Sequence, residues 1–230
     1  MTVTTSSLTR AAGISAAVAG AIFIAVQVKH PPMTVATVAT TEWLVRSGAK
    51  MIMAALALAC ITGMYLRQVR QTGRLGLAGY LVFSIGYLLM FATETIGTFV
   101  LPNLTSSNPR FVNDVVVAAF GDTPSGSIGS LSTFFALSGL FYMGGGLMFG
   151  IALFRARILA RWAAALLAVS TAALAALAVL PDTFNRPMAV PVGVALIGLG
   201  VSLWRDQPSA TPVVSEISAP SATIEPSTVR

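Results

Sequence analysis

Six long runs of apolar residues alternate with short polar segments along most of the chain. Their approximate bounds are residues 11–28, 48–66, 77–99, 131–154, 162–181 and 187–204. Each run is near the roughly 20 helical residues that cross a hydrocarbon core about 30 Å thick. Because lipid offers the backbone no hydrogen-bond partners, such runs are expected to be helices. The pattern predicts an all-α, polytopic membrane protein, with a bundle of six transmembrane helices over residues 10–205.

The arginines of the connecting segments predict how these helices are oriented. If the N-terminus is cytoplasmic, the inner segments hold Arg10, Arg67, Arg70, Arg74, Arg155, Arg157, Arg161 and Arg205. The outer segments then hold Lys29, Arg110 and Arg186, with Arg46 and Lys50 near the outer start of the second run. Basic residues concentrate on the cytoplasmic side of membrane proteins, so both termini are expected there. Residues 1–9 then form a short cytoplasmic N-terminal tail.

The first run has an alternative interpretation as a signal peptide, because Arg10 precedes an apolar stretch. Lys29, His30 and two prolines follow that stretch at once, without a small-residue cleavage site. We therefore expect the first run to be retained as a span.

Two polar segments lie outside the predicted spans. Residues 206–230 are rich in Ser, Thr, Pro and Ala, which predicts a disordered cytoplasmic tail. The outer loop 102–130 contains Asn108 followed by Pro109, a typical helix start. We expect a short amphipathic surface helix at about 109–120. It either shields the helix ends or forms a lid over a cavity.

The third run has one polar side. Tyr80, Ser84, Tyr87, Glu94 and Thr98 recur at helical spacing, opposite a face of Leu and Ile. Such a helix turns its polar side toward other helices. The fourth run carries a related stripe with Ser138 and Tyr142, and contains the triplet Gly144–Gly146, which favours close packing.

Glu94 is the one acid inside a predicted span, and its depth predicts its neighbours. It lies 20 residues after Arg74, or about 30 Å of helix from the inner boundary. Lys50 and Arg46 lie 17 and 21 residues before Arg67, hence at a similar depth on the adjacent antiparallel helix. Three interpretations stay open: a structural ion pair, a glutamate that reaches the interface alone, and a carboxylate that takes up a proton or cation. The candidate intramembrane polar cluster is Glu94, Lys50, Arg46, Tyr87, Thr98, Ser138 and Tyr142.

Composition limits the chemistry of the chain. Only 10% of its 230 residues are charged, and 55% are hydrophobic. A single cysteine and a single histidine leave no thiolate or paired-His metal site, and no phosphate-binding loop is present. We assign no catalytic residue, cofactor or metal, so an enzyme is the least supported class. The net charge of +6 is explained by the loop arginines, and nucleic acid is not an expected partner.

Several segments of the first 90 residues resemble a known group of proteins. They are residues 8–13, His30-Pro31-Pro32, and residues 61–67 with 76–80. They look like uncharacterised bacterial multi-pass integral membrane proteins with no assigned activity. The resemblance, and the excess of Arg over Lys, imply the bacterial cytoplasmic membrane. It implies no role for any residue.

Two functions follow from these patterns. The first is a small integral membrane protein that acts as an accessory or assembly subunit. The alternative is a small-solute or proton-coupled transporter with a polar cavity among spans two, three and four. Partners would be the lipid bilayer and a second copy or another membrane protein; six spans are few for a transporter, so the alternative predicts a homodimer.

Overall fold

The computed structural model describes residues 4–178 and 186–205, and this part of the chain is all-helical. The longer helices are α1 (Thr5–Ala25), α3 (Thr41–Arg67), α4 (Val69–Thr95), α6 (Pro109–Ala119), α7 (Leu131–Ala156), α8 (Arg161–Ala173) and α9 (Val190–Arg205). Short elements are α2 (Val35–Val38), η1 (Ile96–Val100, a π-helix), α5 (Leu101–Leu104), and the 3₁₀ turns η2 (Leu174–Ala178) and η4 (Pro187–Ala189). The predicted tail 206–230 and the end of the fifth predicted span lie outside the described residues.

Local capping extends two helices beyond the apolar runs that predicted them. α1 begins at Thr5, because Thr4 and Ser7 form a reciprocal capping box. Residues 5–9, expected as a tail, are therefore helical. α3 begins at Thr41, because the Thr40 hydroxyl accepts a hydrogen bond from the Trp43 backbone N–H at 3.3 Å.

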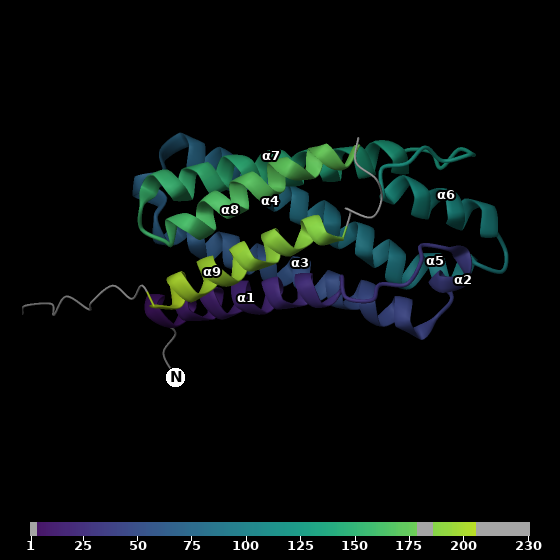
Figure 1. Ribbon diagram of the computed structural model, residues 1–230, viewed down its shortest axis with the longest axis horizontal. Coiled ribbons are helices and arrows are strands. Elements are labelled where there is room, and N and C mark those ends of the chain that lie inside the picture. Colours follow the sequence, from purple (N-terminus) through teal and green to yellow (C-terminus); the bar gives the residue numbers. More distant parts are fainter. Residues whose placement is uncertain (1–3, 179–185, 206–230) are drawn as a thin grey trace, which may run out of the picture.

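Six helices pack antiparallel in a closed circuit (Figure 1). The order around the circuit is α1, α3, α4, α7, α8, α9 and back to α1. The contact between α4 and α7 is the most extensive. A Cβ on Gly86 would lie 2.7 Å from the Tyr142 backbone N, and a Cβ on Gly145 would collide with the Phe83 backbone. Only glycine permits this backbone approach, so α4 and α7 form a tightly packed pair.

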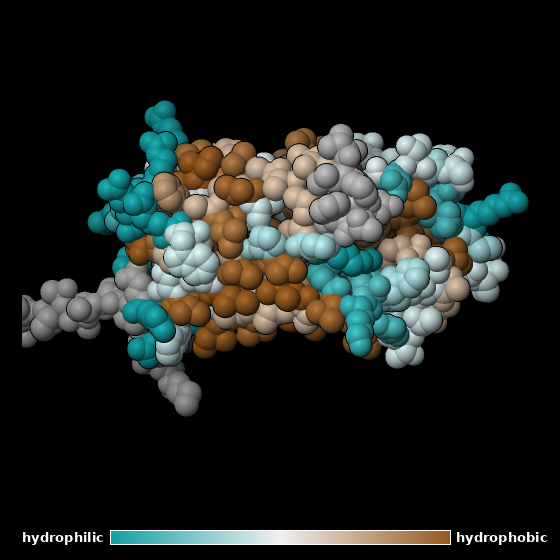
Figure 2. Space-filling view, viewed as in Figure 1, coloured by the Kyte–Doolittle hydropathy of each residue, from teal (hydrophilic) through white to brown (hydrophobic). Residues whose placement is uncertain are grey.

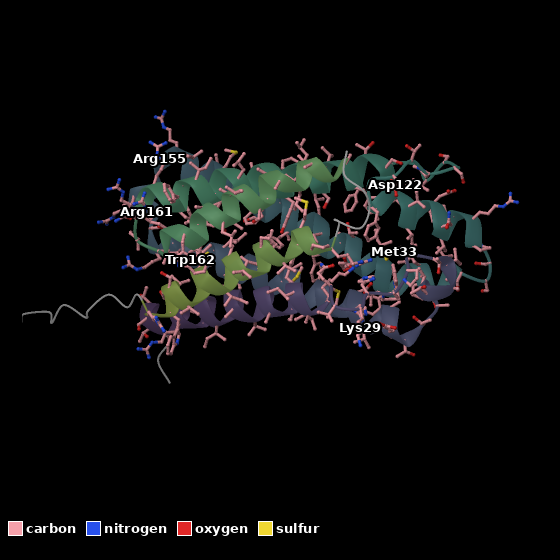
Figure 3. The ribbon with its side chains drawn as sticks, viewed as in Figure 1. Lys29, Met33, Asp122, Arg155, Arg161 and Trp162 are labelled. Atoms are coloured by element: carbon pink, nitrogen blue, oxygen red, sulfur yellow. The ribbon has the colours of Figure 1, made fainter. Side chains whose placement is uncertain are left out.

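The two ends of the bundle differ in chemistry. At the arginine-rich end lie Arg67, Arg70, Arg74, Arg155, Arg157, Arg161 and Arg205. Figure 3 labels Arg155, Arg161 and Trp162 there, with Lys29, Met33 and Asp122 toward the other end. That other end carries α2, α5, α6 and the loop 120–130, which together we call the cap. The cap has its own apolar core, separate from the core of the bundle.

Five of the helices are long and apolar enough to cross a membrane. They are Thr5–Ala25, Thr41–Arg67, Val69–Leu104, Leu131–Ala156 and Pro187–Arg205. A sixth apolar helix, Arg161–Ala176, is shorter. Figure 2 shows an apolar belt between two polar ends on the visible face. These features suggest a multi-pass membrane protein; the count of six spans and the orientation of the termini stay predictions.

Candidate functional site

A cavity of about 100 Å³ lies where the cap meets the bundle. It is lined by Met33, Trp43, Lys50, Thr93, Glu94, Ile96, Gly97, Leu101, Val115, Val116, Ala119, Phe120 and Phe135. α3 and α4 supply its two charged groups, while α6 and α7 supply apolar walls. It is therefore a partly enclosed space that contains one pair of opposite charges.

Lys50 and Glu94 form an ion pair inside this cavity. The Lys50 Nζ lies 3.5 Å from the Glu94 Oε1, and the two side chains are only 17% and 15% exposed. Strong charge-assisted N–H···O bonds are shorter, at about 2.7–2.9 Å, so this pair is loosely closed. The hydroxyl of buried Ser47, three residues before Lys50 on α3, lies near the Glu94 carboxylate.

A π-helical turn follows Glu94 directly and is held from α3. The Trp43 indole Nε1–H donates a hydrogen bond to the Gly97 carbonyl oxygen at 2.8 Å. π-Helical turns widen a helix locally and leave backbone groups without their usual partners. Thr98, in the same turn, is buried, and its hydroxyl has no partner among the described residues. Trp43 thus fixes the segment that carries the cavity wall.

The helix α6 covers the cavity. The helix starts at Asn108, whose side-chain Oδ1 accepts a hydrogen bond from the Phe111 backbone N–H at 3.4 Å. Val112, Val115 and Val116 form the buried face of α6. Asp114 holds the following loop, because its carboxylate accepts from the Ser125 N–H and Oγ at 2.9 and 2.8 Å. The buried apolar face therefore holds α6 over the cavity, and the Asp114 carboxylate ties the following loop to α6.

Arg46 does not face Glu94. Its guanidinium bonds to Glu42 at 2.8 Å and to the carbonyl oxygens of Val26, Val28 and Lys29 at 3.0–3.2 Å. Val26 is the C-cap of α1, and Val28 and Lys29 lie in the turn that follows, so Arg46 sits at the helix C-terminus, where the helix dipole favours a positive charge. The structure places Arg46 as a cap of α1, separate from the Lys50–Glu94 pair.

His30 adds a neutral group to the positively charged surroundings of the cavity. Its Nδ1 lies 2.9 Å from the Pro31 carbonyl oxygen, so Nδ1 carries the proton of the neutral ring. Burial, helped by the positive charges of Lys50, Arg186 and Arg46, lowers the pKa of His30 to about 4 against the opposing Pro31 carbonyl. The imidazole is therefore uncharged at neutral pH.

Tyr87 and Tyr142 lie deeper, below the cavity. Their ring centroids are 5.4 Å apart in an edge-on arrangement, with Phe83 at 4.8 Å from Tyr87 and 5.5 Å from Tyr142. Both hydroxyls are buried without a well-formed hydrogen bond in the described part of the chain, although they lie near each other. Glu94 is seven residues further along, about 10 Å up the helix axis. Ser138 is half-buried one turn of α7 from Tyr142.

The structure therefore divides the candidate cluster. Lys50 and Glu94 share the cavity, Arg46 caps α1, Thr98 lies in the π-helical turn, and the two tyrosines pack deeper in the bundle, outside the cavity lining. Sequence reasoning left Met33 and Phe135 out of the candidate cluster, but it named a lid over a cavity as one of two roles for the helix at about 109–120, which supplies Phe120. It also did not predict the hydrogen bond from Trp43 to the Gly97 carbonyl oxygen. The one available signal was the apolar face of residues 109–120, since contacts between distant segments leave no local pattern.

The fold and this site define a class: an all-helical protein with several apolar helices, suggestive of a multi-pass membrane protein, with a capped cavity at one end. No group of three metal-ligating side chains occurs among the residues searched, which are those of the described ranges. Comparisons with protein-family models, curated proteins and solved structures returned no match.

Proposed function

We propose that this chain is an accessory protein of the bacterial cytoplasmic membrane that binds a small zwitterionic solute in the capped cavity. The observation that carries the proposal is the loosely closed Lys50–Glu94 pair inside a partly enclosed, largely apolar cavity. An isolated charge pair with so little exposure is costly to keep, and polar groups in such places mark sites of function.

The charges of the pair match the two ends of a zwitterion. The solute's ammonium group would bind Glu94 and its carboxylate would bind Lys50. Two short charge-assisted hydrogen bonds to the solute would then replace the single long contact between Lys50 and Glu94. Total charge in the cavity stays balanced in both states. The volume of about 100 Å³ is below the usual 300–1,000 Å³ of ligand pockets and admits only a few non-hydrogen atoms.

The packing below the cavity favours binding over passage. The rings of Tyr87 and Tyr142 pack together in the buried core between the cavity and the arginine-rich end, and α4 contacts α7 backbone to backbone at Gly86 and Gly145. Transport through this path would require α4 and α7 to separate. A solute sensor or accessory subunit needs only movement of the cap.

The topology that accompanies this proposal has six crossings and both termini in the cytoplasm. α8 and η2 together are about 30 Å long at 1.5 and 2.0 Å per residue, which matches the hydrocarbon core. The arginine-rich end would face the cytoplasm and the cap would face outward. The cavity then opens toward solutes outside the cell.

The proposal is tested with three molecules of similar size: alanine, propionate and ethylamine. Each is titrated into purified, detergent-solubilised full-length protein by calorimetry. Alanine carries both charges, while each of the others lacks one. We expect heat of binding from alanine alone, and none when Lys50→Met is combined with Glu94→Gln, which removes both charges together and leaves neither orphaned.

The matched control is Arg110→Gln, which removes an exposed charge on α6 outside the cavity lining and should bind alanine as the parent does. Equal binding of the three molecules, or alanine binding retained by the double variant, contradicts the proposal. Alanine uptake into liposomes would instead support the transporter.

A further inference from the structure

A long groove runs between α8 and α9 on the outside of the bundle. It has a volume of about 640 Å³ and is independent of the capped cavity. Its lining is apolar except at one end: Ile158, Ala160, Trp162, Val194, Ile197, Gly198, Val201, Ser202 and Arg205. From Val194 to Arg205 it follows about 17 Å of α9, roughly half the thickness of a hydrocarbon core.

The groove exists because α8 and α9 make the least extensive contact of the six-helix circuit. They approach at Gly198, where an added Cβ would lie 2.7 Å from the Trp162 ring atom Cζ2. The Ala160 N–H donates to the Ser202 Oγ at 2.9 Å and holds the start of α8 against α9. Despite its contact with α9, Trp162 remains 58% exposed.

Positive charge gathers at the mouth of the groove. Arg205 lines the mouth and forms no ion pair with any residue of the described ranges. Arg161, beside Trp162, lies 4.3 Å above the Phe154 ring, and Arg155 and Arg157 precede it. No acidic residue occurs in the sequence from 123 to 181, and Asp206, next to Arg205, is outside the described residues. Arginine binds phosphate with two parallel hydrogen bonds, so Arg205 is suited to a phosphate head group.

We infer that the groove binds one anionic phospholipid from the leaflet at the arginine-rich end. An acyl chain lies along Val194–Val201, where it passes the Trp162 ring beside Gly198, and the phosphate binds Arg205. Charge complementarity at the mouth and the one-leaflet depth of the groove both fit this occupant. A second copy of the chain would bring another cluster of arginines to the same place, so like charges disfavour it.

The test is native mass spectrometry of the full-length, detergent-purified protein with added phosphatidylglycerol or phosphatidylcholine. We expect one phosphatidylglycerol bound about tenfold more tightly than phosphatidylcholine, because phosphatidylcholine carries the same phosphate but also brings a choline cation to the arginine-rich mouth of the groove. Arg205→Gln should abolish that preference. Arg74→Gln, which removes an exposed arginine at the same end on a helix that does not border the groove, should retain it.

A second pair of variants tests the groove itself. Val201→Phe fills it from a position 38% exposed and should weaken both lipids, whereas Val169→Phe, on an α8 position that is 66% exposed and outside the groove lining, should not. Equal loss with Arg205→Gln and Arg74→Gln would show a diffuse charge effect and overturn the inference. Dimers that Val201→Phe dissociates would assign the groove to a second copy and also overturn it.

Discussion

The α4–α7 contact and the capped end are built on opposite principles. In the first, glycines bring two backbones together with no space for an added methyl group at Gly145. In the second, large side chains such as Trp43 and Phe135 leave a cavity of about 100 Å³ with an ion pair inside. Close backbone packing resists movement, while a cavity beneath a separate small core permits it. The difference predicts that the α4–α7 contact is rigid and that α6 can move over the cavity.

The largest expected effect is at the rigid contact. Gly145→Ala places a methyl group against the Phe83 backbone, so the helices must separate. We expect a loss of about 3 kcal/mol or more in the free energy of unfolding, measured by chemical denaturation in detergent. The control is the preceding residue: a Cβ on Gly144 meets nothing within 4 Å. Gly144→Ala should be neutral or slightly stabilising, and equal losses in the two variants would refute the packing account.

A smaller effect is expected at the ion pair. Glu94→Gln leaves the Lys50 ammonium, which is 17% exposed, without its charged partner, and this should reduce the free energy of unfolding by about 2–3 kcal/mol. Adding Lys50→Met should recover most of the loss, as a double-mutant cycle would show. Glu42→Gln breaks the exposed pair with Arg46, where Glu42 is 54% exposed, and should cost under about 1 kcal/mol. A double variant no better than Glu94→Gln would argue against direct coupling.

The cap should respond without the bundle. Asp114→Ala removes the acceptor of two hydrogen bonds from Ser125, so the loop 120–130 should be cleaved by protease about tenfold faster or more. The denaturation midpoint of the bundle should stay unchanged, because the cap core is separate. Asp122→Ala removes the same charge from an exposed position in that loop and serves as the control. Faster cleavage of the loop accompanied by a lower denaturation midpoint would show instead that the cap and the bundle unfold as one unit.

The smallest effect concerns His30. Its pKa is about 4 in the folded protein and 6.5 in the unfolded chain, so the unfolded chain binds the proton first as pH falls. Its contribution to stability is complete above pH 6.5 and decreases toward pH 4. Because the ring is only half-buried, solvent screening keeps the change small, about 2 °C in thermal midpoint between pH 7.5 and 5. His30→Asn should flatten this part of the profile, and an unaltered slope would exclude His30 as its source.

The sequence predicted the features that local pattern and helix length determine. Apolar runs predicted the helices, and distance along the chain brought Lys50 and Glu94 to one depth; the structure places them 3.5 Å apart. Thr40 and Thr4 then lengthened helices beyond those runs, through side-chain caps that hydropathy ignores. The sequence predicted the depth of Arg46 in the bundle but not the partner of its side chain, because the carbonyl oxygens at the end of α1 compete with Glu94 for the guanidinium. The cavity could not be predicted, because it forms only where the cap packs on α3 and α7, and no local sequence pattern indicates contacts between such distant segments.

The central claim is that α6 moves over a binding site while the α4–α7 contact stays rigid, and hydrogen–deuterium exchange tests it most directly. Backbone amides of α4 and α7 near Phe83 and Gly145 should stay protected, while those of α6 and η1 exchange faster. Saturating alanine should slow exchange in α6 and η1 and leave the α4–α7 contact unchanged. Protection of α6 equal to that of α4 without solute, or an alanine effect confined to the α4–α7 contact, would contradict the account.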